Sequence, residues 1–330
     1  MTNLHAKTSS ISNKIFFCNY WLTYRCNSKC NFCNFWKDES LKKLPDAKIQ
    51  DVEKNLDDLK KMGVKFIDFT GGEPLLNRDL PQILSYAKQL GFFVKLSTNG
   101  LLYPNKADEL KDLASRIYFS FDTTSKEEYE QIRGMDGYDK VVESIEIAKK
   151  QNQDVCLVYT VTDENIKNIP DIANFAKEKK VVVYIHPCFS YFGNKSLSES
   201  NIDIIKKYFW RPYVRMSLPQ LDFHKNGGNN TSRPECKVGS STIDIGPDNC
   251  LTVPCLHRFV ERVEINGKLF SMYTSSEWNK FFEKAGRYEF CDGCTIDCYF
   301  GMSYSDRLKK YFIKQNLTFL KIIIESIRPR

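Results

Sequence analysis

From residue 15 to about residue 195, apolar runs rich in β-branched and aromatic residues alternate with charged segments of helical periodicity. The apolar runs predict strands at 15–24, 64–70, 92–99, 116–122, 155–162 and 181–187. The amphipathic segments predict helices at 49–62, 80–90, 106–114, 138–150 and 169–179. Because strands and helices alternate, we expect parallel strands joined by right-handed crossovers.

Near-continuous apolar strands suit a sheet that is covered by helices or closed into a barrel. A full eight-stranded barrel needs more units than the pattern supplies. We therefore predict an α/β fold, an incomplete (β/α)6 TIM-like barrel over residues 15–195, with a small cysteine-rich C-terminal domain. The unusual stretches "TGGEP", "STNG" and "SFD" lie where predicted strands end, which is where such a fold places its active site.

The pattern changes after the predicted barrel. Residues 196–235 read as a helix followed by a polar, glycine-bearing linker, and 236–300 are cysteine-rich with little regular periodicity. Residues 301–330 read as a basic amphipathic helix, for which docking on the protein is expected and contact with a membrane surface is the alternative. Residues 1–14 form an N-terminal extension without the apolar core of a secretory signal.

The composition of the 330 residues, 42% hydrophobic and 27% charged, is that of a folded protein. The net charge of +7 comes from 48 basic and 41 acidic residues scattered along the chain, so we expect no nucleic-acid partner. The apolar stretch near the C-terminus is too short to cross a bilayer. We expect a cytoplasmic protein, and the basic apolar tail leaves peripheral membrane contact as an open alternative.

The twelve cysteines are unevenly spaced, and such clusters in a reducing compartment more often bind metal than form disulfides. The stretch "CNSKCNFC" supplies Cys26, Cys30 and Cys33 just after the first strand. A structural zinc site takes four ligands. A four-iron cluster held by three cysteines keeps one iron open for another ligand. Read alone, the stretch is compatible with either metal.

Two motifs carry a family resemblance. The CxxxCxxC stretch has the aromatic Phe32 before its last cysteine, and "GGEP" follows the second predicted strand. Together they resemble the radical S-adenosylmethionine (SAM) superfamily, whose fold is an incomplete barrel. The resemblance implies that Cys26, Cys30 and Cys33 bind a [4Fe-4S] cluster, that SAM chelates the fourth iron, and that Phe32 approaches the adenine.

The resemblance also implies positions that bind SAM. Gly71 and Gly72 would let the backbone approach the ligand, and Glu73 would accept hydrogen bonds from its amino group. Residues at the ends of strands three and four would contact the ribose or carboxylate; these are Thr98, Asn99, Ser120 and Arg133. Ser120 and Arg133 have an ordinary alternative as a helix cap and a surface ion pair.

A second group of cysteines resembles the auxiliary-cluster extensions called SPASM and, in shorter form, twitch. Its members are Cys236, Cys255, Cys291, Cys294 and Cys298. The resemblance implies one auxiliary [4Fe-4S] cluster on the first four, with Cys298 as a replacement ligand or a spare. Cys250, between them, is expected to be structural. A zinc ion on the same cysteines is the competing assignment.

Several other candidates have ordinary explanations. Cys18 and Cys156 lie in apolar strands and are expected in the core. His186 and Cys188 end strand six, where packing is favoured over an acid-base role. Asp122 ends strand four, and we expect its side chain either to face the cavity or to cap the next helix. The group at 189–193 could line a substrate pocket or belong to the core. His257 stands where the related sulfatase-maturing enzymes carry an aspartate, which argues against their substrate.

The expected function is therefore that of a radical SAM enzyme. Reductive cleavage of SAM would yield a 5'-deoxyadenosyl radical that abstracts hydrogen from a substrate carbon, for oxidation or bond formation on a peptide or small molecule. A lipid-linked or membrane-proximal substrate is the alternative, and a non-catalytic metal-binding or electron-transfer protein is the alternative of another class. The implied partners are the unknown substrate and an electron donor such as flavodoxin or ferredoxin; the sequence names no catalytic residue.

Overall fold

The computed structural model describes residues 15–190, 193–301 and 311–327. Its described strands form one curved sheet in the order β10-β9-β8-β1-β2-β3-β4-β5-β6-β7. Strands β1 to β7 pair in parallel, each with the next along the chain. The bounds are β1 Phe17–Trp21, β2 Phe66–Thr70, β3 Phe93–Thr98, β4 Arg116–Ser120, β5 Val155–Val161, β6 Val182–Pro187, β7 Val214–Arg215, β8 Thr242–Ile245, β9 Cys250–Cys255 and β10 Arg258–Glu264.

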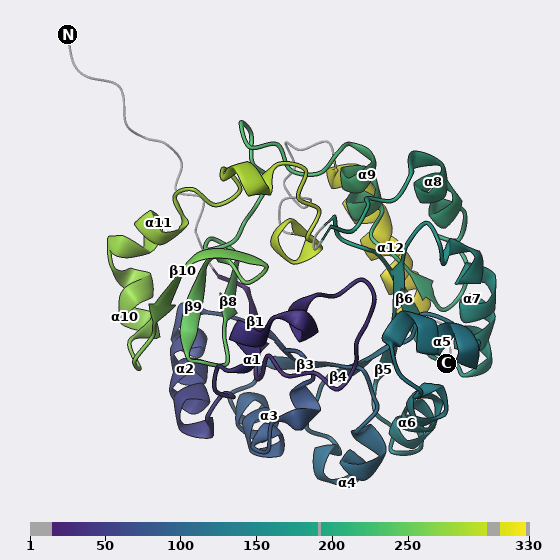
Figure 1. Ribbon diagram of the computed structural model, residues 1–330, viewed down its shortest axis with the longest axis horizontal. Coiled ribbons are helices and arrows are strands. Elements are labelled where there is room, and N and C mark those ends of the chain that lie inside the picture. The colour runs from purple at the N-terminus through teal and green to yellow at the C-terminus, as the bar shows by residue number, and fades with distance from the viewer. Residues whose placement is uncertain (1–14, 191–192, 302–310, 328–330) are drawn as a thin grey trace.

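Helices cover the outside of the curved sheet, as Figure 1 shows. The α-helices are α1 Glu39–Lys42, α2 Ile49–Met62, α3 Leu80–Gln89, α4 Ala107–Leu110, α5 Lys126–Arg133, α6 Tyr138–Lys150, α7 Ile169–Glu178, α8 Glu199–Lys207, α9 Leu218–Lys225, α10 Leu269–Thr274, α11 Glu277–Phe282 and α12 Phe312–Ile327. Short 3-10 helices are η1 Phe35–Lys37, η2 Pro74–Leu76, η3 Tyr103–Asn105, η4 Ile166–Asn168, η5 Glu289–Cys291 and η6 Asp297–Tyr299. The predicted partial barrel, with its strand–helix alternation, is confirmed.

Local sequence signals set several helix ends. Gly63 ends α2 in the left-handed conformation, with φ of 88°, which glycine adopts without strain. The Ser125 hydroxyl caps α5 by accepting a hydrogen bond from the backbone N–H of Glu128. Helices α2, α3, α6 and α7 then bury their apolar stripes, as the amphipathic patterns predict.

The two faces of the strands differ in character. The positions that face the helices are fully buried and apolar, such as Leu96 on β3 and Phe119 on β4. The alternate positions face the inside of the barrel, and many are polar and only partly buried, as the burial patterns of β3 to β6 show. In a closed TIM barrel these positions hold bulky aliphatic residues. This barrel therefore encloses polar side chains.

The cysteine-rich section joins the barrel sheet. β8 pairs in parallel with β1, and β9 and β10 continue the sheet as antiparallel strands. Asp244 on β8 is buried and accepts hydrogen bonds from Asn19 Nδ2 at 2.8 Å, Tyr299 Oη at 2.5 Å and the Leu256 N–H at 3.0 Å. One carboxylate thus ties β1 to the C-terminal section.

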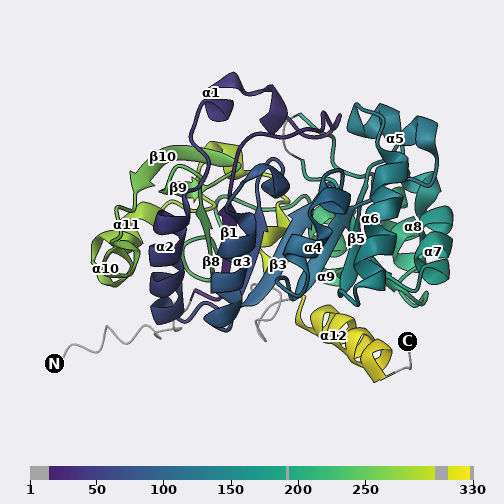
Figure 2. The same cartoon turned by 90° about the horizontal axis from the view of Figure 1, so that it is seen from below.

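Figure 2 shows α12 at one end of the molecule and α1 at the other. α12 docks on the body of the protein through Lys321, whose Nζ donates to the Val214 carbonyl at 2.8 Å. The described part of the predicted C-terminal helix therefore docks on the protein, as expected. Residues 302–310 and 328–330 of the helix predicted at 301–330, and the N-terminal extension 1–14, lie outside the described residues. No helix in the described part of the chain combines the length and apolar character that a membrane span requires.

Candidate active site

The loop from Cys26 to Cys33 leaves β1 and lies across the mouth of the barrel. The end of α5 holds it through backbone hydrogen bonds, from the Lys29 N–H to the Arg133 carbonyl and from the Asn31 N–H to the Ile132 carbonyl, both at 2.9 Å. Gly134 permits this contact, because a Cβ there would lie 2.7 Å from the Lys29 carbonyl oxygen. The position of the three thiols is therefore set by a helix far along the sequence.

The "GGE" turn after β2 packs against the segment that leads into this loop. The N–H of Gly72 donates to the Thr23 carbonyl and the N–H of Glu73 to the Arg25 carbonyl, each at 2.8 Å. A Cβ on Gly72 would lie 2.2 Å from the Arg25 carbonyl oxygen. The backbone of Thr23 to Arg25 thus leaves no room for a side chain at Gly71 or Gly72, with or without a ligand. The sequence had suggested only that these glycines make room for the ligand.

Glu73 is fully buried below this turn. Its carboxylate accepts hydrogen bonds from Thr98 Oγ1 at 2.6 Å, from the Asn99 N–H at 2.8 Å and from the Leu75 N–H at 3.1 Å. Burial raises the pKa of Glu73 to about 7, although these three donors lower it. A cationic group bound nearby would lower the pKa of Glu73 and favour its carboxylate form. The structure thus brings Glu73 together with Thr98 and Asn99, all three of them buried; that they contact SAM stays a prediction.

Hydrogen-bond donors surround the thiols of the loop. Cys26 Sγ accepts from the Ser28 N–H at 3.4 Å and lies 3.9 Å from Asn99 Nδ2, and Cys30 Sγ accepts from Arg133 Nη1 at 3.4 Å. Burial raises the pKa of Cys26 to about 12 and that of Cys33 to about 11. Donors around sulfur stabilise thiolate ligands once a metal has displaced their protons.

Arg133 is buried rather than part of a surface ion pair. It pairs with the buried Asp122, whose carboxylate also accepts from the Thr160 N–H at 2.8 Å. Its guanidinium carbon lies 5.5 Å from the centre of the Phe32 ring. Asp122 therefore positions Arg133 beside the cysteine loop and caps no helix. Ser120, at the end of β4, is half-buried on the inner face of the barrel.

A cavity of about 250 Å³ lies at the barrel mouth, lined by all three thiols of the loop. Gly71, Gly72, His186 and Cys188 form part of its wall. Aromatic side chains form much of the rest, together with His257 from the C-terminal section; they are Trp21, Phe32, Phe35, Trp36 and Phe189. Burial lowers the pKa of His186 to about 4, so its ring is neutral at pH 7.

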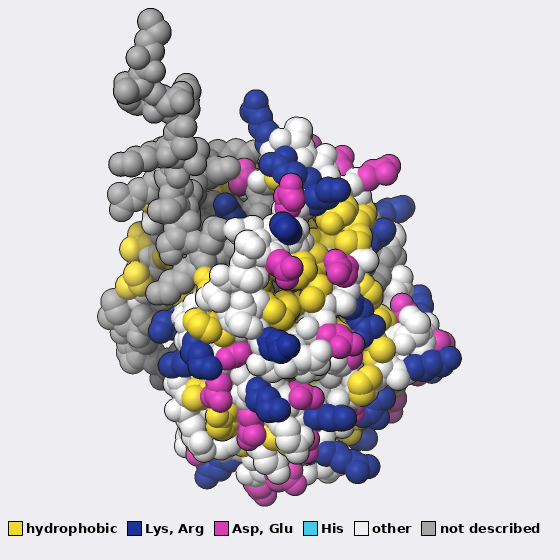
Figure 3. Space-filling model, turned by 90° about the vertical axis from the view of Figure 1, so that its left-hand side faces the viewer, with side chains coloured by type: hydrophobic (Ala, Val, Ile, Leu, Met, Phe, Trp, Pro, Cys, Tyr) yellow, Lys and Arg dark blue, Asp and Glu magenta, His cyan; other side chains and the backbone are white. Residues whose placement is uncertain are grey.

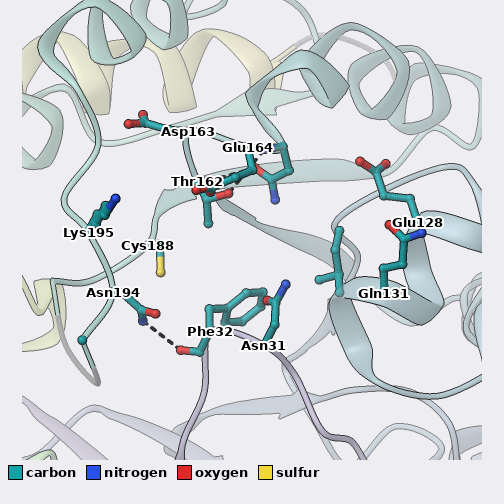
Figure 4. A pocket seen from close by; sticks show the side chains of 13 residues that line it. Asn31, Phe32, Glu128, Gln131, Thr162, Asp163, Glu164, Cys188, Asn194 and Lys195 are labelled. Atoms are coloured by element: carbon teal, nitrogen blue, oxygen red, sulfur yellow. Dashed lines mark hydrogen bonds between the residues drawn. The ribbon is translucent and has the colours of Figure 1, made fainter.

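A second cavity of about 530 Å³ opens on the other side of Phe32 (Figure 4). Cys188 points into it, and Asn194 Nδ2 donates to the Phe32 carbonyl at 2.9 Å. Polar side chains such as Glu128, Glu164 and Lys195 line its outer part. Phe32, Cys188 and Asn194 line both cavities, which therefore adjoin.

Three thiols lining one cavity are a donor set suited to a four-iron cluster. Among the described residues, no three Cys, His, Asp or Glu side chains converge on a point that could hold a single metal ion. An iron–sulfur cluster takes one thiolate on each iron, so its ligands surround a space. Cys26, Cys30 and Cys33 would hold such a cluster, with Gly71 and Gly72 leaving room beside it.

Three of the five C-terminal cysteines, Cys236, Cys255 and Cys294, pack against one hydrophobic cluster, and Cys291 lies close to two of them. Burial raises the pKa of Cys236 to about 12 and that of Cys294 to about 11; nearby cysteines add to each shift, and Cys255 is raised by burial and by Cys236 and Cys294 among others. Cys291 adds to the shifts of both Cys236 and Cys294. These four are the ligands predicted for an auxiliary cluster. Only Leu256 separates Cys255 from His257, which lines the inner cavity.

Cys298 lies apart from this group. Its charged neighbours are Lys95, Asp297, Asp244 and Asp68, and burial raises its pKa to about 12. It thus faces the inside of the barrel, where it is surrounded by protein yet keeps accessible surface. Cys250 is buried at the start of β9. Cys18 and Cys156 are also buried, as expected.

Asn229 anchors the turn between Cys291 and Cys294, although the sequence marked its segment as a linker. Its Nδ2 donates to the Cys291 carbonyl at 3.0 Å, its N–H to the Cys294 carbonyl at 2.9 Å, and its carbonyl accepts from the Gly293 N–H at 2.8 Å. Sequence reasoning missed this residue and also Asn194. Phe189, from the aromatic group at 189–193, lines the inner cavity; residues 191–192 lie outside the described residues.

Comparison with known proteins agrees with this geometry. The model of the Radical SAM superfamily matches residues 21–176. A probable GTP 3',8-cyclase from Sulfolobus acidocaldarius is 28% identical in an alignment of 258 positions that covers 69% of this chain and 77% of that protein. A probable GTP 3',8-cyclase from Sulfurisphaera tokodaii is 34% identical over 62% of this chain and 69% of its own. Fe-coproporphyrin III synthase from Methanosarcina barkeri is 29% identical over 54% of this chain and 45% of its own.

Solved structures share the fold at lower identity. Streptococcus suis SuiB bound to S-adenosylmethionine superposes with a TM-score of 0.66 and 16% identity, covering 88% of this chain and 71% of SuiB. The enzyme anSMEcpe with bound AdoMet and a Cp18Cys peptide has a TM-score of 0.63 and 15% identity, covering 94% of this chain and 99% of that one. At these identities the likeness shows the fold alone.

The packing of the "GGE" turn gives a testable prediction. Gly72→Ala should lower the free energy of unfolding by roughly 1–3 kcal/mol, because the added methyl group meets the Arg25 backbone, which cannot move without displacing the cysteine loop. Gly301→Ala is the matched control, since a Cβ there meets no atom of the described residues within 4 Å. Urea unfolding followed by circular dichroism measures both, and equal midpoints for the two variants would contradict the account.

Proposed function

This chain belongs to the radical SAM superfamily, and on that premise we propose that it cleaves SAM reductively and abstracts hydrogen from a carbon of a polar substrate. The observation that carries the proposal is that Cys26, Cys30 and Cys33 line one cavity with the "GGE" turn and the inner ends of β5 and β6. A [4Fe-4S] cluster bound there supplies the low-potential electron that breaks a carbon–sulfur bond of SAM.

The residues of the site support distinct parts of SAM binding. Glu73 accepts hydrogen bonds and can receive the amino group of the methionyl end, which would shift the carboxyl toward its charged form. Asn99, whose N–H is fixed by Glu73, holds its side chain beside Cys26. Phe32, between the two cavities, offers an aromatic face to the adenine. Thr98, Ser120 and Arg133 remain predicted contacts in the same region.

The polar inner face of the barrel supports a polar substrate. Lys95 pairs with Asp68 at 2.6 Å, and its ammonium group lies 4.5 Å from the centre of the Tyr118 ring. Ser97 Oγ donates to the same Asp68 at 2.8 Å. Above this row, Thr160 and His186 line the cavity that holds the three thiols. These groups already pair with one another, and a polar substrate could add hydrogen bonds to this row, whereas an aliphatic chain has no donor or acceptor to offer it.

We also propose an auxiliary [4Fe-4S] cluster on Cys236, Cys255, Cys291 and Cys294, in a twitch-like arrangement. His257, two residues after Cys255, lines the cavity that the thiols of Cys26, Cys30 and Cys33 also line. Such a cluster could take the electron of a substrate radical, which would make the reaction an oxidation or a bond formation. The electron donor is expected to be a flavodoxin or ferredoxin, and the enzyme to work in the reducing cytoplasm.

Iron analysis tests the auxiliary cluster. Protein purified and reconstituted without oxygen should contain about eight irons per chain, four for each cluster. Cys294→Ala should contain about four, whereas Cys298→Ala should keep about eight because Cys298 lies apart from the other thiols. About four irons in the unaltered protein, with or without one zinc, would remove the auxiliary cluster.

SAM cleavage tests the central function. Reduction with dithionite in the presence of SAM should release 5'-deoxyadenosine, detected by liquid chromatography and mass spectrometry. Cys30→Ala should abolish the product, Cys294→Ala should retain some uncoupled cleavage, and the buried-thiol control Cys18→Ala should behave as the parent. If the fully reconstituted parent releases no 5'-deoxyadenosine, the chain is instead a metal-binding or electron-transfer protein.

A second candidate function has GTP as the substrate. It is favoured by similarity to the probable GTP 3',8-cyclase of Sulfolobus acidocaldarius over 77% of that protein. If this chain shares that activity, GTP should stimulate SAM cleavage and become a nucleotide joined between carbons 3' and 8. GTP deuterated at the 3' carbon should then transfer deuterium to deoxyadenosine. SAM cleavage without any change in GTP would exclude this candidate and leave peptides and other small molecules as the alternatives.

A further inference from the structure

Helix α12 attaches to the protein through its polar side chains. Lys321 is 4% exposed; it binds the Val214 carbonyl and pairs with Glu325 one turn later. Arg215 Nε contacts the same Glu325 carboxylate at 3.3 Å. At the other end of the helix, Lys314 pairs with Asp222 of α9. Lys321 and Glu325 thus point toward the body, whereas Lys314 stays half-exposed, and each of the three has a partner of opposite sign.

The apolar side chains of α12 point away from the body. Their exposed fractions run from 37% for Ile324 to 73% for Ile313; the set, here called the α12 outer face, is Ile313, Leu317, Phe319, Leu320, Ile323 and Ile324. Among the described side chains of the helix, the other exposed ones are Lys314 and Asn316, and none is acidic. This arrangement reverses the usual amphipathic helix, which buries its apolar stripe in the protein.

A contiguous apolar face of this kind marks an interaction surface. A different face of the molecule, in Figure 3, mixes basic and acidic side chains as an ordinary solvated surface does. On α12, the six apolar side chains would lose contact with water if another phase covered them, and each would be stabilised by the apolar area it removes from water. The face therefore has a strong tendency to bind an apolar phase.

We propose that the α12 outer face docks this protein on an anionic membrane surface. The charges favour such a surface, since Glu325 and Asp222 are neutralised by their partners while the chain as a whole carries +7. Trp210, in the segment on which α12 rests, is 63% exposed, and Lys207 beside it is exposed as well. Exposed tryptophan, lysine and an apolar helix face are features of helices that lie in the plane of a membrane interface.

The docked orientation leaves the active site open to water. The segment under α12 includes Val214 and Arg215, which pair with Val183 and Tyr184 at the start of β6. The cavities open at the other end of that strand, beside Cys188. Figure 2 accordingly shows α12 at the end of the molecule opposite to α1. The membrane would hold the enzyme in place, while its substrate arrives from solution, and this inference does not depend on the proposed reaction.

Sedimentation with vesicles tests the proposal on the full chain with its clusters reconstituted. Vesicles of phosphatidylcholine with phosphatidylglycerol should carry the protein into the pellet, with less binding to phosphatidylcholine alone and less at high salt. The double variant Leu317→Gln, Leu320→Gln should weaken binding roughly tenfold or more, since each leucine loses its apolar contact with the bilayer. Both side chains are exposed, so the variant should fold and cleave SAM as the parent does.

Val260→Gln is the matched control, because Val260 is 56% exposed but lies on β10. It should bind vesicles as the parent does. The proposal is overturned if the parent does not bind anionic vesicles, or if the double variant binds them equally well. It is also overturned if sedimentation velocity finds a dimer of the parent that the double variant abolishes, which would make the α12 outer face a contact between two copies of the chain.

Discussion

The contact between the "GGE" turn and residues Thr23 to Arg25 is the constraint on which the site depends. Two backbone segments meet there with no side chain between them, and their hydrogen bonds of 2.8 Å continue the pairing of β1 and β2 beyond the strands. Because the cysteine loop begins at the next residue, Cys26, this contact fixes where the loop starts. Glycine is required at both positions by packing within the protein, before any ligand is considered.

A second fixed point holds the far side of the loop. Arg133 binds Cys30 Sγ with its side chain and Lys29 with its carbonyl, and buried Asp122 holds the guanidinium. Removing one partner of a buried ion pair typically costs 3–5 kcal/mol, because the other charge stays buried and unpaired. The pair therefore secures the loop and places a positive charge beside thiols that must become thiolates to bind metal. Arg133, Asp122 and Cys30 thus both hold the loop in place and set the charge around its thiols.

The sequence predicted what depends on local pattern and failed where distant segments meet. The six barrel strands and the five predicted helices follow from periodicity, and the three thiols do share a cavity; α5, which holds the cysteine loop, was not predicted. Three features had no local signal. Asn229 lies in a polar stretch that resembles a linker, yet it holds the Cys291–Cys294 turn. β8 shows no distinct pattern, yet it pairs with β1. For Arg133 the expectation was a contact with SAM or, alternatively, a surface ion pair; its buried partners Asp122 and Cys30 are brought to it only by the fold.

The central claim is that three cysteines leave one iron of a cluster free to bind SAM. Electron–nuclear double resonance on the reduced, reconstituted protein tests it directly, with SAM labelled with ¹⁵N at its amino group. The account predicts a ¹⁵N coupling to the cluster in the parent protein and in the Cys294→Ala variant, which retains the cluster of the cysteine loop. A reduced cluster that shows no coupling to labelled SAM in either protein would contradict it.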